Sequence, residues 1–382
     1  MNRVAVLGVG QTHHAKARTD VSLPGLIREA VHRALEDAGS TFADVDAVVV
    51  GTAPDFFEGI TQPEQWLAGA LGAVGKPVLR VHTAGSVGGS TAVSAATHVG
   101  SGLFERVLAV AFEKHSEGDA LWGLSPRNPF GRAFGAGAGA FFAPHCRLYV
   151  ERSGAPAEIG PRVAVKARAN AARNPYAHLR EPVTVEEVTG SPMLWDPIRR
   201  LESCPTSDGA AAMVFATESV AAGRPRVAWV RGAAAMAEAA GFPGRDALDP
   251  AVGRACAKAV YAQSGVTDPR RDLDVAEIYE PFSWIEVMWY ENLGFCGPNE
   301  GWRLLESGVT EPSGDLPVNP SGGVLATNPI GASGMLRMVE AVEQVRGRAG
   351  DRQVDGARLA LGHAYGGASN YFAMMAFGSE PA

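Results

Sequence analysis

The amino-acid sequence predicts an α/β protein built on a mostly parallel β-sheet with helices on both faces. Short apolar strands alternate with amphipathic helices along the chain, as in sheets of this kind. Segments of the second half repeat segments of the first, which predicts two similar halves packed about a pseudo-twofold axis. Residues 78–96 combine a predicted strand, a glycine-rich turn and a helix of small residues, an order that places Ser86 at a helix N-terminus.

The first half contains the segments that define this sheet. Apolar runs at residues 3–8, 44–51 and 106–112 are typical of buried strands. Residues 26–38 carry apolar side chains at helical spacing, and Gly39 is a stop signal for that helix. These segments therefore predict a sheet in which strands alternate with covering helices.

Residues 113–200 have a different character. Prolines, aromatic residues and polar residues cluster there, which favours an inserted lobe over a continuation of the sheet core. Long insertions between regular elements usually serve as lids or binding loops. Residues 207–212 then lead back into a predicted strand at 213–216.

The second half repeats the order of the first. The matching segments are 226–232 with 3–8, 251–265 with 26–38, 272–279 with 44–51, and 358–362 with 106–112. In the third pair, Asp274 matches Asp46, and Tyr279 falls where Gly51 lies. This internal duplication is the most fold-specific feature of the sequence.

Composition and charge exclude several classes of protein. The 382 residues are 46% apolar and 20% charged, as in a globular protein, and the net charge of −7 argues against a nucleic-acid binder. No apolar run reaches the roughly 18 residues that a membrane helix needs. The four cysteines lack CxxC spacing, so we expect neither a disulfide framework nor a zinc site. The N-terminal residues do not form a signal peptide, and we expect a cytoplasmic protein.

Two interpretations fit the glycine-rich turn at Ser86. A strand–turn–helix unit can hold a nucleophile where the helix dipole favours negative charge. Alternatively, the glycines only allow helix and sheet to pack closely, and spacing alone favours this second interpretation because such turns are common.

Six motifs together indicate a family. They are HTAGSVGGSTA at 82–92, SDGAAA at 207–212, EIYEPF at 277–282, NPSGG at 319–323, NPIGASG at 328–334 and GHAYGG at 362–367. With them the chain resembles the thiolase superfamily. Within it, the chain is most similar to the sterol-carrier-protein-type thiolases and their lipid-transfer-protein-like relatives, near the actinobacterial steroid side-chain aldolases.

The resemblance implies a fold and a domain division. The expected halves are residues 1–225 and 226–382, each a βαβαβαββ unit, and together they form a five-layer αβαβα sandwich. A loop lobe at about 113–200 is inserted in the first half and covers the acyl-CoA. The expected dimer forms through strands next to the nucleophile turn, here residues 79–85 and 106–112.

The catalytic pattern departs from that of thiolases. Ser86 stands where the family has its nucleophilic cysteine, Tyr279 replaces an active-site histidine, and Pro281 replaces the neighbouring cysteine. Asn328 replaces the histidine that activates the nucleophile, whereas His363 remains in the last glycine-rich loop. A serine hydroxyl needs a strong adjacent base, so ordinary thiolytic transfer is not expected.

The remaining groups suit aldol chemistry. An oxyanion hole that stabilises a thioester enolate serves a retro-aldol cleavage without a covalent acyl-enzyme. By resemblance to the steroid side-chain aldolases, we expect cleavage of a β-hydroxyacyl-CoA, with Tyr279 as general acid/base. His363 is expected in proton transfer or at the oxyanion site, and Asn328 as an oxyanion donor. Glu280 is the alternative base if burial raises its pKa, and Ser86 is expected to be a hydrogen-bonding remnant.

Other interpretations stay open. One is an acyltransferase that uses Ser86 or a cysteine such as Cys296, and another is a non-catalytic subunit that binds CoA esters. Tyr279 could instead pack in an aromatic cluster, and His363 could be a loop histidine bonded to backbone.

The sequence also suggests partners without fixing them. The substrate carries coenzyme A, no cofactor or metal of the chain itself is expected, and the residues that contact CoA are not located. Relatives act with an OB-fold, zinc-ribbon protein, so a hetero-oligomer is expected besides the homodimer. Aromatic runs at 121–134 and 282–290 could line a pocket, meet a partner or simply pack in the core.

Overall fold

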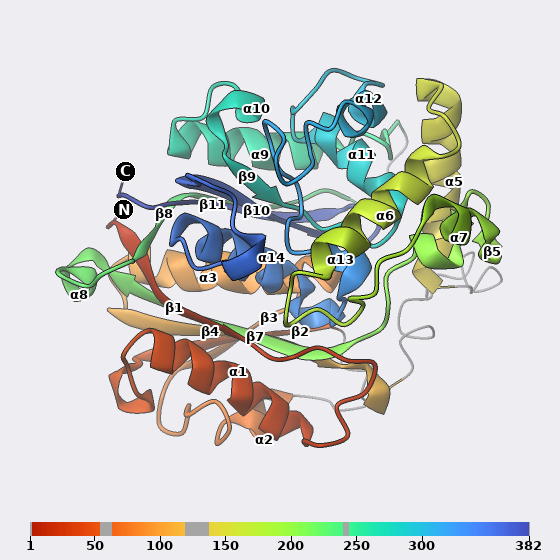
Figure 1. The fold of residues 1–382 in the computed structure, drawn as a ribbon. Helices are drawn as coiled ribbons and strands as arrows, with labels where there is room; N and C mark the ends of the chain where they lie inside the picture. Colours follow the sequence, from red (N-terminus) through yellow and green to blue (C-terminus); the bar gives the residue numbers. More distant parts are fainter. Residues whose placement is uncertain (1, 54–62, 119–136, 240–243, 382) are drawn as a thin grey trace.

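The computed structural model describes residues 2–53, 63–118, 137–239 and 244–381, and in these ranges one large sheet dominates the fold (Figure 1). Its strands are β1 (Val4–Gln11), β2 (Ala47–Thr52), β3 (Val78–Val81), β4 (Arg106–Lys114), β7 (Asp208–Thr217), β8 (Ala228–Ala237), β9 (Val275–Glu277), β10 (Leu359–Gly366) and β11 (Tyr371–Gly378). They lie in the order β3-β2-β4-β7-β1-β8-β11-β10-β9. The expected strands are therefore present, although the one predicted at 272–279 is limited to β9.

The strand order confirms the duplication. β1 and β8 meet at the centre through only two residue pairs, Ala5–Trp229 and Val6–Ala228. From there β7, β4 and β2 follow on one side, and β11, β10 and β9 follow on the other. A parallel bridge between Ala276 and Val318 stands where the first half has β3. The chain thus contains two copies of one βαβαβαββ unit.

The expectation of a mostly parallel sheet was wrong. β2 pairs in parallel with β3 and β4, and β9 pairs in parallel with β10. The pairings of β4 with β7, β7 with β1, β1 with β8, β8 with β11 and β11 with β10 are all antiparallel. The last strand of each unit, β7 or β11, runs antiparallel to the strand before it. Such buried strands have the same continuous apolar pattern as parallel ones.

Helices complete a five-layer sandwich. Helices α3 (Val87–Gly100) and α14 (Ile330–Val345) lie between the two halves of the sheet, as Figure 1 shows. Helix α1 (Leu23–Asp37) covers the outer face of the first half, and α9 (Ala251–Ser264) and α11 (Ser283–Asn292) cover that of the second. Three apolar clusters fill the spaces between these layers. The αβαβα sandwich predicted by the family resemblance is confirmed.

Shorter helices complete the chain. They are α2 (Pro63–Leu67), α8 (Glu218–Ala221), α10 (Pro269–Asp272), α12 (Gly301–Glu306) and α13 (Gly323–Ala326). The inserted lobe contains α5 (Gly137–Ser153), α6 (Ile159–Ala171), α7 (Val185–Gly190) and the hairpin of β5 (Met193–Trp195) and β6 (Ile198–Arg199). The aromatic run at 121–134 lies outside the described residues. The run at 282–290 consists of Phe282 and most of α11, and its aromatic side chains are buried.

One of the two strands expected at a dimer interface lies inside the sheet. β4 is paired along one edge with β2 and along the other with β7, so it has no free edge for a second copy. The family resemblance placed it at the interface as a strand next to the nucleophile turn, but the sheet order places it two strands from the border. β3 is the border strand on the side of the first half, in the described part of the chain.

Candidate active site

Ser86 lies where the sequence predicts, at the N-cap of helix α3 after a short 3-10 turn. Its hydroxyl donates to the backbone oxygen of Thr83 at 2.8 Å and also lies 3.0 Å from the hydroxyl of Thr83. The side chain is buried, and no hydrogen bond in the described structure joins it to a histidine or carboxylate. The hydroxyl is therefore held by local hydrogen bonds to Thr83, without the adjacent base that a serine nucleophile needs.

The first turns of α3 and α14 pack against each other at glycines. A Cβ atom on Gly88 would lie 2.5 Å from the backbone nitrogen of Met335, and one on Gly334 would lie 2.7 Å from that of Gly89. Two helix N-termini with their positive dipole ends thus meet at Ser86. This arrangement favours negative charge that develops beside the turn.

The two helix N-termini are not equivalent. The backbone N–H of Gly331 in α14 donates to the Glu113 carboxylate at 3.1 Å, and that of Ile330 donates to Nε2 of His115 at 3.2 Å. Helix α3 has no acidic residue in its first turn. The dipole of α14 is therefore offset by protein groups, whereas that of α3 keeps its full effect on a ligand.

Tyr279 and Tyr365 form an edge-to-face pair beside this turn. Their ring centroids are 5.4 Å apart at an interplanar angle of 86°, and both side chains are buried. A Cβ atom on Gly85 would lie 3.6 Å from the hydroxyl of Tyr279, which places that hydroxyl over the turn. The hydroxyl of Tyr365 is buried and has no hydrogen-bond partner in the described residues. Burial raises the pKa of both tyrosines, so both phenols keep their protons at neutral pH.

Asn328 faces the tyrosine pair through Ser333. The Ser333 hydroxyl donates to Oδ1 of Asn328 at 2.7 Å, and its hydrogen bonding to Tyr279 partly opposes the rise of the tyrosine pKa. Nδ2 of Asn328 donates to the sulfur of Cys204 at 3.1 Å. The amide is thus oriented by two neighbours and presents a donor beside Cys204 and Tyr279.

His363 lies in strand β10 and not in a loop, which corrects the expectation from the glycine-rich sequence around it. The backbone N–H of Tyr279 donates to its Nδ1 at 3.2 Å, and burial lowers the pKa of the imidazole to about 3. The ring is therefore neutral, and because Nδ1 accepts, the proton is on Nε2. That Nε2–H is buried and lacks a partner among the described residues. His363 is thus an N–H donor and a poor base.

Glu280 follows Tyr279 but belongs to a different cluster. One carboxyl oxygen accepts from the backbone N–H of Leu325 at 3.2 Å, and the other has no partner in the described part of the chain. Burial, and then repulsion from Glu286, raise the pKa of this carboxyl well above its ordinary value. The protonated acid is favoured at neutral pH, which suits a proton donor better than a general base.

Sequence reasoning missed three residues of this site, Tyr365, Cys204 and Ser333. Tyr365 had a usable signal, because residues two apart on a strand share a face and it lies two residues after His363. Cys204 had no such signal in the sequence, because residue spacing does not reveal that the end of the lobe packs against the Asn328 loop. The cysteine proposed as an alternative, Cys296, has Glu291 and Glu300 as its charged neighbours and is not part of this cluster.

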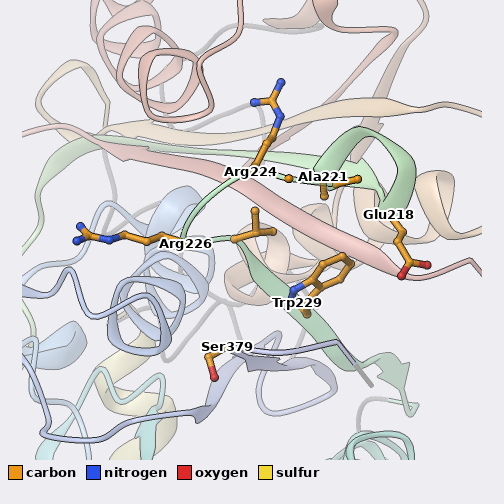
Figure 2. A pocket seen from close by; sticks show the side chains of 9 residues that line it. Glu218, Ala221, Arg224, Arg226, Trp229 and Ser379 are labelled. Atoms are coloured by element: carbon orange, nitrogen blue, oxygen red, sulfur yellow. The ribbon is translucent and has the colours of Figure 1, made fainter.

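Two cavities of the described structure lie away from the tyrosine pair. One of about 330 Å³ opens beside α8 and β8, where Trp229 lines it and Arg224 and Arg226 point away from each other (Figure 2). Another of about 650 Å³ is lined by α1, the end of α14 and residues 175–176. Neither Tyr279 nor Tyr365 lines these two cavities.

In the described residues there is no cluster of three or more His, Cys, Asp or Glu side chains that could hold a metal. None of the described helices is long and apolar enough to cross a membrane.

Comparison with known proteins identifies the family. Residues 234–379 match the family model described as thiolase C-terminal domain-like. An acetyl-CoA acetyltransferase of Methanothermobacter thermautotrophicus is 33% identical over 396 aligned residues, which cover 99% of this chain and 100% of the relative. The chain belongs to the thiolase superfamily.

Two further relatives place it within the thiolase superfamily. Human sterol carrier protein 2 is 30% identical, and the alignment covers 96% of this chain and 70% of that protein. The solved structure of an Ltp2–ChsH2(DUF35) aldolase has a TM-score of 0.84 and 29% identity, and covers 98% of this chain and 97% of that one. Both confirm the predicted sterol-carrier-protein-type branch of the thiolase superfamily.

Proposed function

We propose that this thiolase-like protein cleaves a carbon–carbon bond of a β-hydroxyacyl-CoA by a retro-aldol reaction. The observation that carries the proposal is the buried pair of Tyr279 and Tyr365 over the N-terminus of α3. Tyr279 supplies a phenol where a thiolase has an imidazole, and Ser86 stands in place of the nucleophilic cysteine. The aldolase relative at 29% identity supports the same reaction class.

The reaction needs one proton removed and one delivered. Breaking the bond between the α and β carbons turns the β-hydroxyl into a carbonyl and leaves an enolate on the thioester. The raised pKa of Tyr279 makes its phenol the acid that protonates the α-carbon. The two transfers are concerted, because both phenols are protonated beforehand: as Tyr279 gives its proton to the α-carbon, the tyrosine pair takes the proton of the β-hydroxyl, and the enzyme is regenerated.

The enolate oxygen needs donors during this step. The dipole of α3, the amide of Asn328 and the unpartnered Nε2–H of His363 are the available groups. A well-placed donor of this kind contributes on the order of 3–4 kcal/mol to the transition state. None of these steps needs a cofactor of the chain, since coenzyme A arrives with the substrate.

Acyl transfer is the second candidate function. It is favoured by the acetyl-CoA acetyltransferase relative and by the position of Cys204 beside Asn328. Burial raises the pKa of the Cys204 thiol to about 12, and no base bonds to Ser86 among the described residues, so neither is activated as a nucleophile. For this reason we rank acyl transfer below aldol cleavage, with a non-catalytic CoA-ester-binding subunit as the remaining possibility.

We also propose an assembly with a second protein. The aldolase relative is named as a complex of two components, Ltp2 and ChsH2(DUF35). The partner that we expect for this chain is an OB-fold, zinc-ribbon protein. We also expect the chain to form a homodimer and to act in the cytoplasm. A steroid or branched side chain is the acyl group we expect.

Product analysis separates the candidates. The protein, alone and with the OB-fold protein, is incubated with a β-hydroxyacyl-CoA, and in parallel with a β-ketoacyl-CoA plus free CoA. Conversion of the hydroxy substrate to a carbonyl compound and a shorter acyl-CoA, with no CoA consumed, supports the aldolase. Consumption of CoA with the keto substrate, or a mass increase of the protein by one acyl group, overturns it in favour of acyl transfer.

A further inference from the structure

Glu202, at the end of the inserted lobe, joins three elements of the fold. It ends the short 3-10 helix Arg200–Glu202 and is 1% exposed. One carboxyl oxygen accepts from the Ser283 hydroxyl at the start of α11 at 3.0 Å, and the other accepts from the backbone N–H of Arg199 at 3.0 Å. A Cβ atom on Gly160 of α6 would lie 2.1 Å from the carboxyl oxygen, so the carboxyl packs directly on that helix.

The residues after Glu202 pair with the residues after Tyr279. Ser203 and Phe282 form an antiparallel bridge, and the backbone N–H of Cys204 donates to the oxygen of Pro281 at 2.9 Å. The bond between Glu202 and Ser283 closes this short ladder at one end. At the other end, the thiol of Cys204 accepts the bond from Asn328. The lobe segment 202–204 therefore connects the loop that carries Tyr279 to the loop that carries Asn328.

We infer that Glu202 is a positioning residue, whose ionised carboxylate holds the Tyr279 loop and the Asn328 amide in their reactive arrangement. The inference rests on the proposed function, because the arrangement matters through the roles given to Tyr279 and Asn328. Glu202 itself touches neither residue.

The charge state of this carboxyl changes near neutral pH. Burial raises the pKa of Glu202 to about 7, and the bonds from Arg199 and Ser283 partly oppose the rise. The groups that face it are the guanidinium of Arg199 on its own segment, the thiol of Cys146 on α5, and Ser283 and Trp284 on α11. Gly160 of α6 contributes no titratable group.

The direction of the effect follows from the hydrogen bonds. The Arg199 N–H and the Ser283 hydroxyl both donate to Glu202. An ionised carboxylate accepts from both, whereas a protonated carboxyl uses one of its oxygens as a donor. Protonation below pH 7 therefore weakens the clamp, and turnover should fall on the acid side. Bonds to charged acceptors are the stronger ones, so roughly tenfold or more should separate the clamped and unclamped states.

Two variants and one control test this. Glu202→Gln keeps the shape of the side chain, but its amide N–H₂ donor faces the two groups that donate to Glu202, the Arg199 N–H and the Ser283 hydroxyl. Ser283→Ala removes one bond and leaves the carboxyl titratable. Glu187→Gln is the matched control, because Glu187 caps α7 in the same lobe through Thr184 and is exposed. The rate of β-hydroxyacyl-CoA cleavage is measured from pH 5.5 to 9 for all four proteins.

Each profile has a distinct expected form. The wild type and Glu187→Gln should lose rate below about pH 7, and Glu202→Gln should be about tenfold slower at pH 8 without that loss. In Ser283→Ala the loss should move to higher pH, because a bond that favours the carboxylate is gone. An acid limb that is the same in Glu202→Gln and wild type overturns the inference.

Hydrogen exchange keeps the clamp testable without turnover. The amide of Cys204, which donates to Pro281, is followed by exchange and mass spectrometry, with the intrinsic pH dependence of exchange removed. Its protection should fall about tenfold from pH 8 to pH 6 in the wild type, and should be low at both pH values in Glu202→Gln. Equal protection in the two proteins overturns the clamp. Absent turnover with the expected protection contradicts the proposed reaction alone.

Discussion

Asp46 and Asp274 make the same bonds in the two halves of the molecule. The Oδ2 atom of Asp46 accepts from the backbone N–H groups of Glu105 and Arg106 at 2.9 and 2.8 Å. The Oδ2 atom of Asp274 accepts from those of Arg358 and Leu359, both at 2.8 Å. Each carboxylate thus fixes the start of the strand that pairs with its own strand, β4 in one half and β10 in the other.

We expect Asp46→Ala and Asp274→Ala to destabilise the protein by similar amounts. Each leaves two backbone N–H groups without their carboxylate, which costs about 1–3 kcal/mol. Urea unfolding of the two variants and of the double variant measures this. Similar single effects that add in the double variant are expected, since the sites are far apart. A negligible effect at either site would contradict the equivalence of the two bonds.

Tyr279→Phe should lower the rate of β-hydroxyacyl-CoA cleavage by roughly 10²–10⁴, because the phenol supplies the proton. The fold should be unaffected, since the ring and its contact with Tyr365 remain. Tyr261→Phe is the control. Tyr261 lies on α9, outside the site, and its hydroxyl donates to the backbone oxygen of Leu293 at 2.9 Å. The rate of this variant should match that of the wild type. A loss below tenfold in Tyr279→Phe would remove Tyr279 from the reaction.

Ser86→Ala should retain cleavage activity within about fivefold. Its hydroxyl bonds to Thr83 and to no base within the described ranges. Its loss should therefore cost a local hydrogen bond of about 1 kcal/mol and no chemistry. Steady-state kinetics and intact-protein mass after exposure to acyl-CoA give the result. A drop of 100-fold or more, with loss of an acylated species, would restore the serine as a nucleophile.

Gly366→Ala should disrupt the site through the backbone. A Cβ atom there would lie 2.4 Å from the backbone nitrogens of Gly85 and Ser86, so the end of β10 and the turn would have to separate. We expect a loss of about 1–3 kcal/mol in stability and a large fall in cleavage rate. Gly190→Ala, where nothing lies within 4 Å of the added atom, should behave like the wild type.

Glu343→Gln should stabilise the protein in a pH-dependent way. Burial raises the pKa of this carboxyl to about 7, and its nearest guanidinium contact, to Arg346, is long at 3.7 Å. A raised folded-state pKa means that stability falls as pH rises from the ordinary value of 4.5 to about 7. The variant avoids this loss, so its gain should be near zero at pH 4.5 and about 1–3 kcal/mol at pH 8.

Urea titrations at the two pH values measure the gain for Glu343→Gln. Glu36→Gln, which changes an exposed carboxyl at the same 650 Å³ cavity, is the control and should show little change. An equal effect of Glu343→Gln at both pH values would contradict the buried, raised carboxyl.

The duplication could be predicted from the sequence patterns, and the five layers from the family resemblance. Strand and helix patterns recur in the same order, and the matched residues Asp46 and Asp274 bond equivalent backbone N–H groups in the two halves. The direction of the strands could not be predicted, because a strand buried on both faces is apolar throughout whether its neighbours are parallel or antiparallel. The place of β4 inside the sheet depends on β7, which returns only after the inserted lobe.

For the site, the sequence by itself determined which side chains differ from those of a thiolase, namely Ser86, Tyr279 and Asn328. Only the tertiary structure decided how they are used: it pairs Tyr279 with Tyr365, joins Asn328 to Cys204, and fixes the proton of His363 on Nε2. The physical reason is that protonation state and hydrogen bonding depend on burial and on neighbours from distant segments. Burial sets the pKa values here, and burial is a property of the packed fold that no local pattern contains.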